Sequence, residues 1–202
     1  MPAVDPTSEW LRRRFAARAL PAEAIDGDQD ARPDSGTLTA ASVLVPIVTH
    51  DAALTMLFTR RTAHLRDHSG QISFPGGRAE PGDPTPQATA MREAFEEIGL
   101  EAGRVELLGC LSEYRTRTGF RVTPVVALVT PPFALRPDSF EVDEVFEVPL
   151  AFLLDPDNHQ RHAREIRGRV ANYYAIPYRD YYIWGATAGM VVNLYRFLAS
   201  PG

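Results

Sequence analysis

A tight turn followed at once by an acidic helix is the feature of this sequence that most restricts its fold. The turn is "FPGG", residues 74–77, and the helix "PQATAMREAFEEIG" is bounded by prolines at its start and by Gly99, a natural stop. With about 100° between successive residues, three carboxylates are predicted to share one face: Glu93, Glu96 and Glu97. The apolar residues are predicted on the opposite face: Ala88, Met91, Phe95 and Ile98.

The three glutamates alone leave two interpretations open. Like charges three or four residues apart repel each other on a helix, although the absence of lysine from the whole chain weakens any argument from the lack of interleaved positive charge. One interpretation is a solvated acidic face, and the other is a site for hard divalent cations, because Mg²⁺ prefers carboxylate oxygens. The turn favours the second, since Gly76 and Gly77 are free to adopt positive φ where the chain turns, and their backbone amides could approach a phosphate.

The segment "REAFEEIGL", residues 92–100, resembles the second half of the Nudix box, G-x5-E-x7-R-E-U-x-E-E-x-G-U, with Ala94 at the first U position. The first half departs from that pattern. Asp83 stands where the pattern has glutamate, and Arg92 comes one residue late, which a one-residue insertion around "AEPGDPTP" explains. Glu80 and Asp83 are therefore alternatives for the acidic residue of the loop.

A second resemblance is more specific. The segment "LFTRRTAHLRDHSGQISFPGG", residues 57–77, is similar to a pattern of the coenzyme A pyrophosphatase subgroup of Nudix hydrolases, and "TGFRVTPVV" resembles another segment of that subgroup. The resemblance implies hydrolysis of the pyrophosphate linkage of coenzyme A, giving 4′-phosphopantetheine and adenosine 3′,5′-bisphosphate. The alternatives are a Nudix pyrophosphatase for ADP-ribose or another nucleoside diphosphate derivative, and a nucleotide-sensing domain that does not cut its ligand.

The resemblance also implies roles for individual residues. The ligands for Mg²⁺ or Mn²⁺ would be Glu93, Glu96 and Glu97. The catalytic residues would be Glu96, Glu97, Arg92 and Glu144, with Arg92 orienting a carboxylate of the box. The substrate-binding residues would be Arg61, Arg66, Gly76 and Gly77, because guanidinium groups fork onto phosphate oxygens. For the two arginines, the alternative is a structural role that closes the loop before "FPGG". Glu144, and less firmly Glu141, is predicted to be an acid that lies opposite the helix and serves as the general base. The competing interpretation is an exposed acid on an edge strand.

The fold implied is α/β, a Nudix-type α/β/α sandwich with a mixed β-sheet between helices. Residues 1–36 are predicted to form an N-terminal helix, residues 8–20, and a linker arm, and residues 37–202 the Nudix hydrolase domain. Strands are predicted in apolar, β-branched segments: "ASVLVPIVT", "ALTMLFTR", "RVELLGCLSEY", "FRVTPVVALVT" and "FEVDEVFEVPL". "NYYAIPYRDYYIWG" is predicted as a strand pair, "HQRHAREIRGR" as a solvated hairpin rather than a phosphate clamp, and residues 184–198 as an amphipathic helix.

The composition limits which binding partners and which cellular compartment are expected for the protein. A formal net charge of −5 disfavours nucleic acid as a partner but leaves a small phosphorylated ligand, such as a coenzyme A-like molecule, open. A single cysteine, Cys110, excludes an internal disulfide and suits a reducing compartment. No stretch approaches the roughly 20 apolar residues that span a bilayer, and no signal sequence is evident, so we expect a cytoplasmic protein without membrane contact. The sequence leaves a homodimer open.

Overall fold

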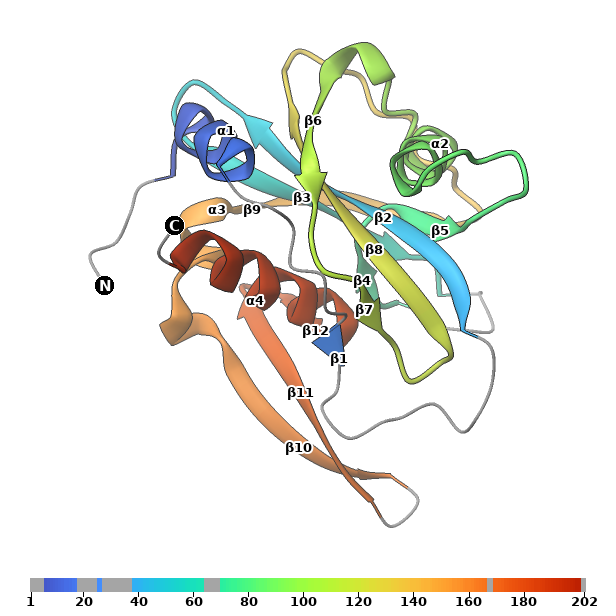
Figure 1. Cartoon of the computed structure of the whole chain (residues 1–202), viewed down its shortest axis with the longest axis vertical. Helices are drawn as coiled ribbons and strands as arrows, with labels where there is room; N and C mark the ends of the chain where they lie inside the picture. The colour runs from blue at the N-terminus through green and yellow to red at the C-terminus, as the bar shows by residue number, and fades with distance from the viewer. Residues whose placement is uncertain (1–5, 18–24, 27–37, 64–69, 167–168, 201–202) are drawn as a thin grey trace.

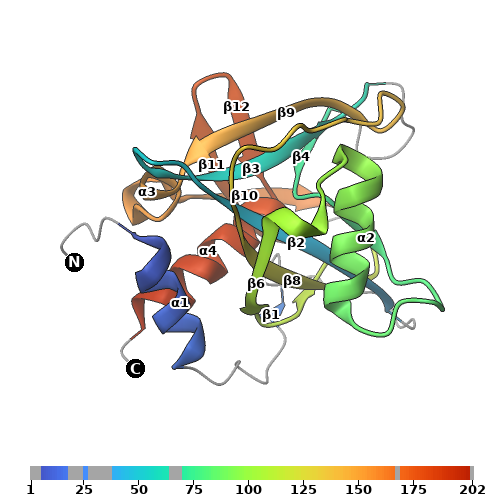
Figure 2. The ribbon, with the colours of Figure 1, turned by 90° about the horizontal axis from the view of Figure 1, so that it is seen from above.

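A mixed β-sheet forms the centre of the molecule, with helices on both of its faces (Figures 1 and 2). The structure is a computed structural model that describes residues 6–17, 25–26, 38–63, 70–166 and 169–200. Within these residues the sheet has nine strands, with α2 on one face and α1 and α4 on the other. The predicted fold class, an α/β sandwich with a mixed sheet between helices, is confirmed.

The longest pairing in the sheet joins β2 (Thr39–Thr49) to β8 (Phe120–Val129) in parallel. Both strands are buried along most of their length, as expected for strands covered on two faces. On the other side of β2, β3 (Leu54–Arg61) runs antiparallel to it, and β9 (Val142–Pro149) runs antiparallel to β3. The shorter strands are β1 (Ile25–Asp26), β4 (Ile72–Ser73), β5 (Gly76–Arg78), β6 (Val105–Cys110) and β7 (Tyr114–Arg115).

Helix α2 (Pro86–Ile98) begins and ends where the sequence predicts. The Thr85 side chain accepts a hydrogen bond from the Ala88 amide at 3.2 Å, and Gly99 ends the helix in the left-handed conformation, φ 67°. The predicted apolar face is wrong at Phe95, whose side chain is 60% exposed. The face against the sheet instead consists of Ala90, Ala94, Ile98, Thr89 and Glu97. Two alanines in that contact let the helix axis lie close to the strands.

Helix α1 (Ser8–Ala16) packs into the main core rather than standing apart from it. Its Leu11 and Phe15 side chains are buried, and the Phe15 ring lies 4.7 Å from that of Phe197 in α4. The linker predicted after this helix falls mostly outside the described residues, but Ile25–Asp26 pairs in parallel with β7. The division at residue 36 stays a prediction.

A second sheet of three strands covers the remaining side of α4 (Figure 1). Its strands are β10 (Gln160–Ile166), β11 (Arg169–Tyr178) and β12 (Tyr181–Trp184), which confirms the predicted strand pair and hairpin. Helix α4 (Ala186–Ala199) is buried on nearly all sides, whereas the sequence pattern predicts one apolar face. The reason is its position between two sheets. The remaining short elements are α3 (Leu150–Leu153) and two 3₁₀ turns, Ala102–Arg104 and Pro156–Asn158.

An aromatic stack crosses the sheet beneath the "FPGG" turn. The Phe74 ring lies 4.9 Å from Phe58, Phe58 lies 5.7 Å from Phe146, and Phe146 lies 3.7 Å from Tyr181 of β12. Phe58, Phe74 and Phe146 are buried in the core on the α4 side of the sheet. The stack therefore connects the second sheet to the residue that starts the turn.

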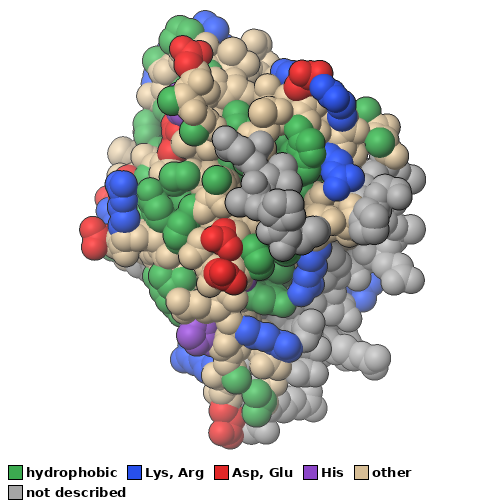
Figure 3. Space-filling model, turned by 90° about the vertical axis from the view of Figure 1, so that its left-hand side faces the viewer, with side chains coloured by type: hydrophobic (Ala, Val, Ile, Leu, Met, Phe, Trp, Pro, Cys, Tyr) green, Lys and Arg blue, Asp and Glu red, His purple; other side chains and the backbone are tan. Residues whose placement is uncertain are grey.

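The face of the molecule drawn in Figure 3 carries both acidic and basic side chains. Among the described residues on the face drawn in Figure 3, acidic and basic side chains alternate with apolar ones instead of forming one broad basic surface. In the part of the chain that the structure describes, no helix combines the length and the apolar character needed to cross a membrane.

Candidate active site

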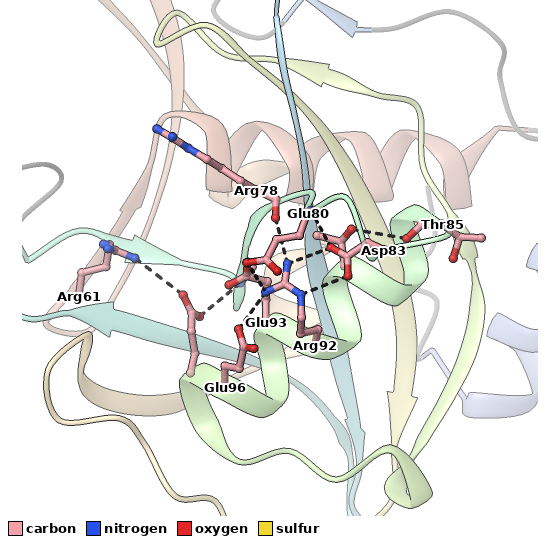
Figure 4. Close-up of polar contacts among 11 residues, drawn as sticks. Arg61, Arg78, Glu80, Asp83, Thr85, Arg92, Glu93 and Glu96 are labelled. Atoms are coloured by element: carbon pink, nitrogen blue, oxygen red, sulfur yellow. Dashed lines mark hydrogen bonds and ion pairs between the residues drawn. The ribbon is translucent and has the colours of Figure 1, made fainter.

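The two glycines of the "FPGG" turn are required by close packing. Gly76 pairs with Val43 of β2, and a Cβ on Gly76 would lie 2.6 Å from the Val43 Cα. A Cβ on Gly77 would lie 2.6 Å from the Glu93 Oε2. Neither glycine adopts the positive φ open to it, and both lie in the extended strand β5. The absence of side chains brings the turn into direct contact with the glutamates of α2 (Figure 4).

Glu97 is a buried carboxylate that faces this turn. Only 5% of the residue is exposed, and its Oε2 accepts a hydrogen bond from the Gly76 amide at 3.3 Å. The Arg61 Nη1 lies 3.8 Å from its Oε1. Burial raises the pKa of Glu97 to about 8, because desolvation disfavours the charged form more than Arg61 and the Gly76 amide stabilise it. A solvated acidic face is therefore excluded for this residue.

Arg92 is the centre of the polar contacts between the loop and the helix (Figure 4). It makes a two-point pair with Asp83, with Nε–Oδ1 at 3.2 Å and Nη2–Oδ2 at 2.9 Å, and its Nη2 also donates to the Arg78 carbonyl oxygen at 3.0 Å. Its Nη1 reaches Glu93 Oε1 at 3.0 Å and Glu96 Oε2 at 2.9 Å. The hydrogen bonds with Asp83 raise the pKa of Arg92 and hold that of Asp83 well below its usual range.

Asp83 and Glu80, the two alternatives for the loop acid, differ clearly in their contacts. The Glu80 carboxylate is 64% exposed and lies 3.9 Å from the Arg92 Nη1. The Asp83 carboxylate is 8% exposed, pairs with Arg92 at two points and accepts a hydrogen bond from the Glu80 amide at 2.9 Å. A tight turn, in which the Asp83 amide donates to the Glu80 carbonyl, accommodates the extra residue of this loop. These contacts favour Asp83 over Glu80 as the acidic residue of the loop.

The three helix glutamates differ in exposure. Glu97 is buried, Glu93 has a side chain 16% exposed, and Glu96 has one 55% exposed. Burial raises the pKa of Glu93, and the neighbouring Arg92 opposes that shift. Among the described residues, no three His, Cys, Asp or Glu side chains are grouped as a metal site in their present conformation. The positions next to these carboxylates are taken by the guanidinium groups of Arg92 and Arg61.

The prediction that Glu144 lies opposite the glutamate helix is wrong. Its carboxylate accepts a hydrogen bond from the Tyr181 hydroxyl at 2.7 Å and pairs with Arg60 at 2.9 Å. Side chains alternate between the two faces of a strand, and Glu144 shares its face with Phe146, which belongs to the core on the α4 side. Glu144 therefore points to the face of the sheet opposite α2.

Glu141 directly precedes β9, and its charge reaches the helix glutamates. Its negative charge contributes to the raised pKa of both Glu93 and Glu97. The Thr62 amide donates to the Glu141 carbonyl at 3.0 Å, and the Asp138 amide donates to the Glu97 carbonyl at 2.9 Å. These bonds tie the loop before β9 to the ends of β3 and α2. The segment "FEVDEV", residues 140–145, contains several acids close together, and its sequence does not show whether Glu141 or Glu144 faces the site.

Of the two arginines predicted to bind substrate, Arg61 lies at the end of β3 beside Glu97, with a side chain 28% exposed. Arg66 lies outside the described residues. The contact between Arg61 and Glu97 was not predicted, because it joins residues of two separate patterns in the sequence. The backbone of Gly76 completes the group, since its amide points at the same carboxylate.

Comparisons with known proteins identify the family of this chain. The model of the NUDIX domain matches residues 38–168. An uncharacterized Nudix hydrolase NudL of Photorhabdus laumondii subsp. laumondii is 40% identical over 154 residues, covering 76% of this chain and 82% of that protein. A protein of the same description from Escherichia coli (strain K12 / DH10B) is 39% identical over 156 residues, covering 76% and 80%.

Among solved structures, a C. elegans Ap4A hydrolase in a binary complex is 19% identical, with a TM-score of 0.48, and the match covers 55% of this chain and 80% of that one. The family follows from the extent of the domain match and from the identity to the two NudL proteins. The chain belongs to the NUDIX domain family and is a Nudix hydrolase, an enzyme of the pyrophosphohydrolase class.

Proposed function

We propose that this enzyme hydrolyses the pyrophosphate bond of coenzyme A or its derivatives, giving 4′-phosphopantetheine, or its acyl form, and adenosine 3′,5′-bisphosphate. One observation carries the proposal. The segment that resembles the coenzyme A pyrophosphatase pattern supplies Arg61 and Gly76, and the Nudix box supplies Glu97, and these three residues are neighbours in the structure. Two patterns that are separate in the sequence thus support a single site.

Nudix hydrolases generally use divalent metal ions, and the residues of this site fit such an ion. Glu97 is buried, and Arg61 at 3.8 Å offsets its desolvation only in part, so the pKa stays raised to about 8. A divalent cation beside this carboxyl group would favour its charged form. We propose that Glu93, Glu96 and Glu97 hold Mg²⁺ or Mn²⁺, which suits an oxygen donor set. When bound, such an ion would supply positive charge for the phosphoryl oxygens.

The protein's own residues would then divide the remaining tasks. Arg92, held by Asp83, would keep the loop and the glutamates in register, which makes it a positioning residue. Arg61 and the backbone of the glycine turn would bind phosphate oxygens. Glu141, whose charge already acts on Glu93 and Glu97, replaces Glu144 as the proposed acid that orients or deprotonates the attacking water.

Substrate assays test the proposal directly. The enzyme is incubated with coenzyme A, an acyl-coenzyme A, ADP-ribose and a dinucleotide, each with Mg²⁺ or Mn²⁺, and the products are separated by chromatography. We expect adenosine 3′,5′-bisphosphate from the first two at the highest kcat/KM. Cleavage of ADP-ribose or the dinucleotide with no cleavage of coenzyme A would reject the substrate assignment.

A pair of variants links the activity to the site. Glu97→Gln is expected to abolish turnover because it removes the charge of the buried carboxylate. Glu101→Gln is the matched control, since Glu101 is an exposed acid just beyond the helix whose side chain caps nothing. If Glu97→Gln retained full turnover, the metal assignment would be wrong.

A further inference from the structure

Two arginines contact the glutamates of this site, and they are held very differently. Arg92 is fixed by the two-point pair with Asp83 and by the Arg78 carbonyl, in addition to its contacts with glutamates. Among the described residues, the Arg61 guanidinium has a single ion pair, in which its Nη1 lies 3.8 Å from Glu97 Oε1, beyond hydrogen-bond distance. Of the two, Arg61 is the one that can leave its carboxylate at little cost.

The local strand geometry explains why Arg61 and not Arg60 faces the site. Successive side chains of β3 point to opposite faces of the sheet. Arg60 pairs with Asp143 and Glu144 of β9, where an irregularity in the pairing places two acids next to one arginine. Such irregularities re-aim side chains beside functional sites. Arg60 therefore has its ion-pair partners on the face of the sheet opposite α2, whereas Arg61 lies beside Glu97 on the α2 face.

We propose that Arg61 is an exchangeable partner of Glu97: it lies beside that carboxyl group in the metal-free enzyme, leaves when a divalent cation binds there, and then binds a phosphate oxygen of the substrate. This inference rests on the proposed function. A divalent cation at Glu97 would repel a guanidinium only 3.8 Å away from the same carboxylate. The side chain, which is partly exposed, can turn toward solvent, where a planar guanidinium binds phosphate at two points.

Movement of Arg61 from Glu97 to the substrate phosphate couples metal binding to anion binding. Such coupling is reciprocal, so each ligand changes the affinity for the other by the same factor. Removal of Arg61 therefore has effects of opposite sign: metal binds more tightly in the absence of substrate, and a phosphate ligand binds more weakly once metal is present. An arginine that bound phosphate without contacting Glu97 would change the affinity for the metal no more than Arg60 does. An arginine with a purely structural role would weaken both.

The first experiment measures Mn²⁺ binding alone, by electron paramagnetic resonance of the free ion. Arg61→Gln is expected to bind Mn²⁺ about tenfold more tightly than the unchanged enzyme, a factor equal to about 1.4 kcal/mol. Arg60→Gln is the matched control, because it removes the same charge one residue away on the opposite face. Unchanged or weaker Mn²⁺ binding by Arg61→Gln, or equal tightening by both variants, would overturn the proposal.

The second experiment measures binding of methylenediphosphonate, a non-hydrolysable P–C–P anion, by calorimetry with and without saturating Mg²⁺. With Mg²⁺ present, Arg61→Gln is expected to weaken binding about tenfold or more, and Arg61→Lys to weaken it less, because lysine keeps the charge but loses the fork. Equal affinity for Arg61→Gln and the unchanged enzyme would overturn the proposal. Neither experiment uses turnover, so a failure to cleave coenzyme A would reject the proposed function alone. Thermal unfolding of each variant checks that it is folded.

Discussion

Asp83 and Arg92 form a two-point ion pair that ties the loop between β5 and α2 to the middle of the helix. The same guanidinium holds Glu93 and Glu96, so the position of the loop and the position of the proposed metal ligands depend on one side chain. This arrangement makes the loop acid a positioning residue.

Asp83→Asn is therefore expected to lower kcat about tenfold to a hundredfold, because displacement of reacting groups by about 1 Å has costs of that size. Glu80→Gln is the matched change, since its carboxylate is mostly exposed and lies 3.9 Å from Arg92. It should leave kcat within about a factor of two, because exposed ion pairs contribute about 1 kcal/mol or less. A larger loss in Glu80→Gln than in Asp83→Asn would reverse the assignment of the loop acid.

Glu97 predicts how stability depends on pH in the metal-free enzyme. Its folded-state pKa of about 8 lies above the ordinary value of 4.5, so between these pH values the folded chain binds more protons than the unfolded chain. The free energy of unfolding in EDTA should consequently fall as the pH rises from about 5 to about 8, as measured by urea unfolding.

Two comparisons isolate that effect. In Glu97→Gln the decrease should be largely absent, because the amide does not titrate. Added Mg²⁺ should stabilise the unchanged enzyme more at pH 8 than at pH 5.5, because the ion binds the deprotonated carboxylate and competes with protons. A stability that rises with pH over this interval in both proteins would show that Glu97 is not the controlling group.

The two glycines of the turn should respond differently to alanine. In Gly76→Ala the new Cβ meets backbone atoms of Ser42 and Val43, which cannot move away cheaply, and a loss of about 3 kcal/mol in the free energy of unfolding is expected. In Gly77→Ala the three atoms nearest the Cβ all belong to the Glu93 carboxyl group, which can rotate. That variant should fold normally and lose metal affinity, and denaturant unfolding with Mn²⁺ titration would distinguish the two.

The side of α2 that packs against the sheet can be tested by a third pair of variants. Ala94 is fully buried, so Ala94→Leu should destabilise the fold by about 1–3 kcal/mol through overpacking. Phe95 is 60% exposed, so Phe95→Ala should change the free energy of unfolding by about 0.5 kcal/mol or less. The opposite order in thermal or urea unfolding would restore the face predicted from the sequence pattern.

The sequence predicts features that depend on neighbours along the chain. Prolines before α2 and Gly99 after it define the helix because capping is local, and the strands at β2 and β8 follow from continuous apolar runs. The side of α2 that is buried does not follow from its own residues. It depends on how closely the helix approaches β2, which favours Ala90 and Ala94 over larger apolar side chains.

The candidate site shows the same limit. The residues of the Nudix box and of the upstream segment were identified from spacing, but Arg61 and Glu97 become neighbours only when β3 and α2 pack. Glu144 was misplaced because the face of a strand residue depends on pairing register, and β9 contains an irregularity at this point. Burial of Glu97, which raises its pKa, is likewise a property of the packed structure.

The aromatic stack from Phe74 to Tyr181 has a consequence for motion. The Phe74 ring stacks on Phe58 within the core, and the Leu44 amide donates a hydrogen bond to the Pro75 carbonyl at 2.8 Å. The turn is therefore held by the sheet as well as by helix α2. Opening of the turn would require β12 and β9 to loosen with it. The Gly76 amide should therefore exchange with deuterium as slowly as core strands do, and substrate would meet a turn already set in its working shape.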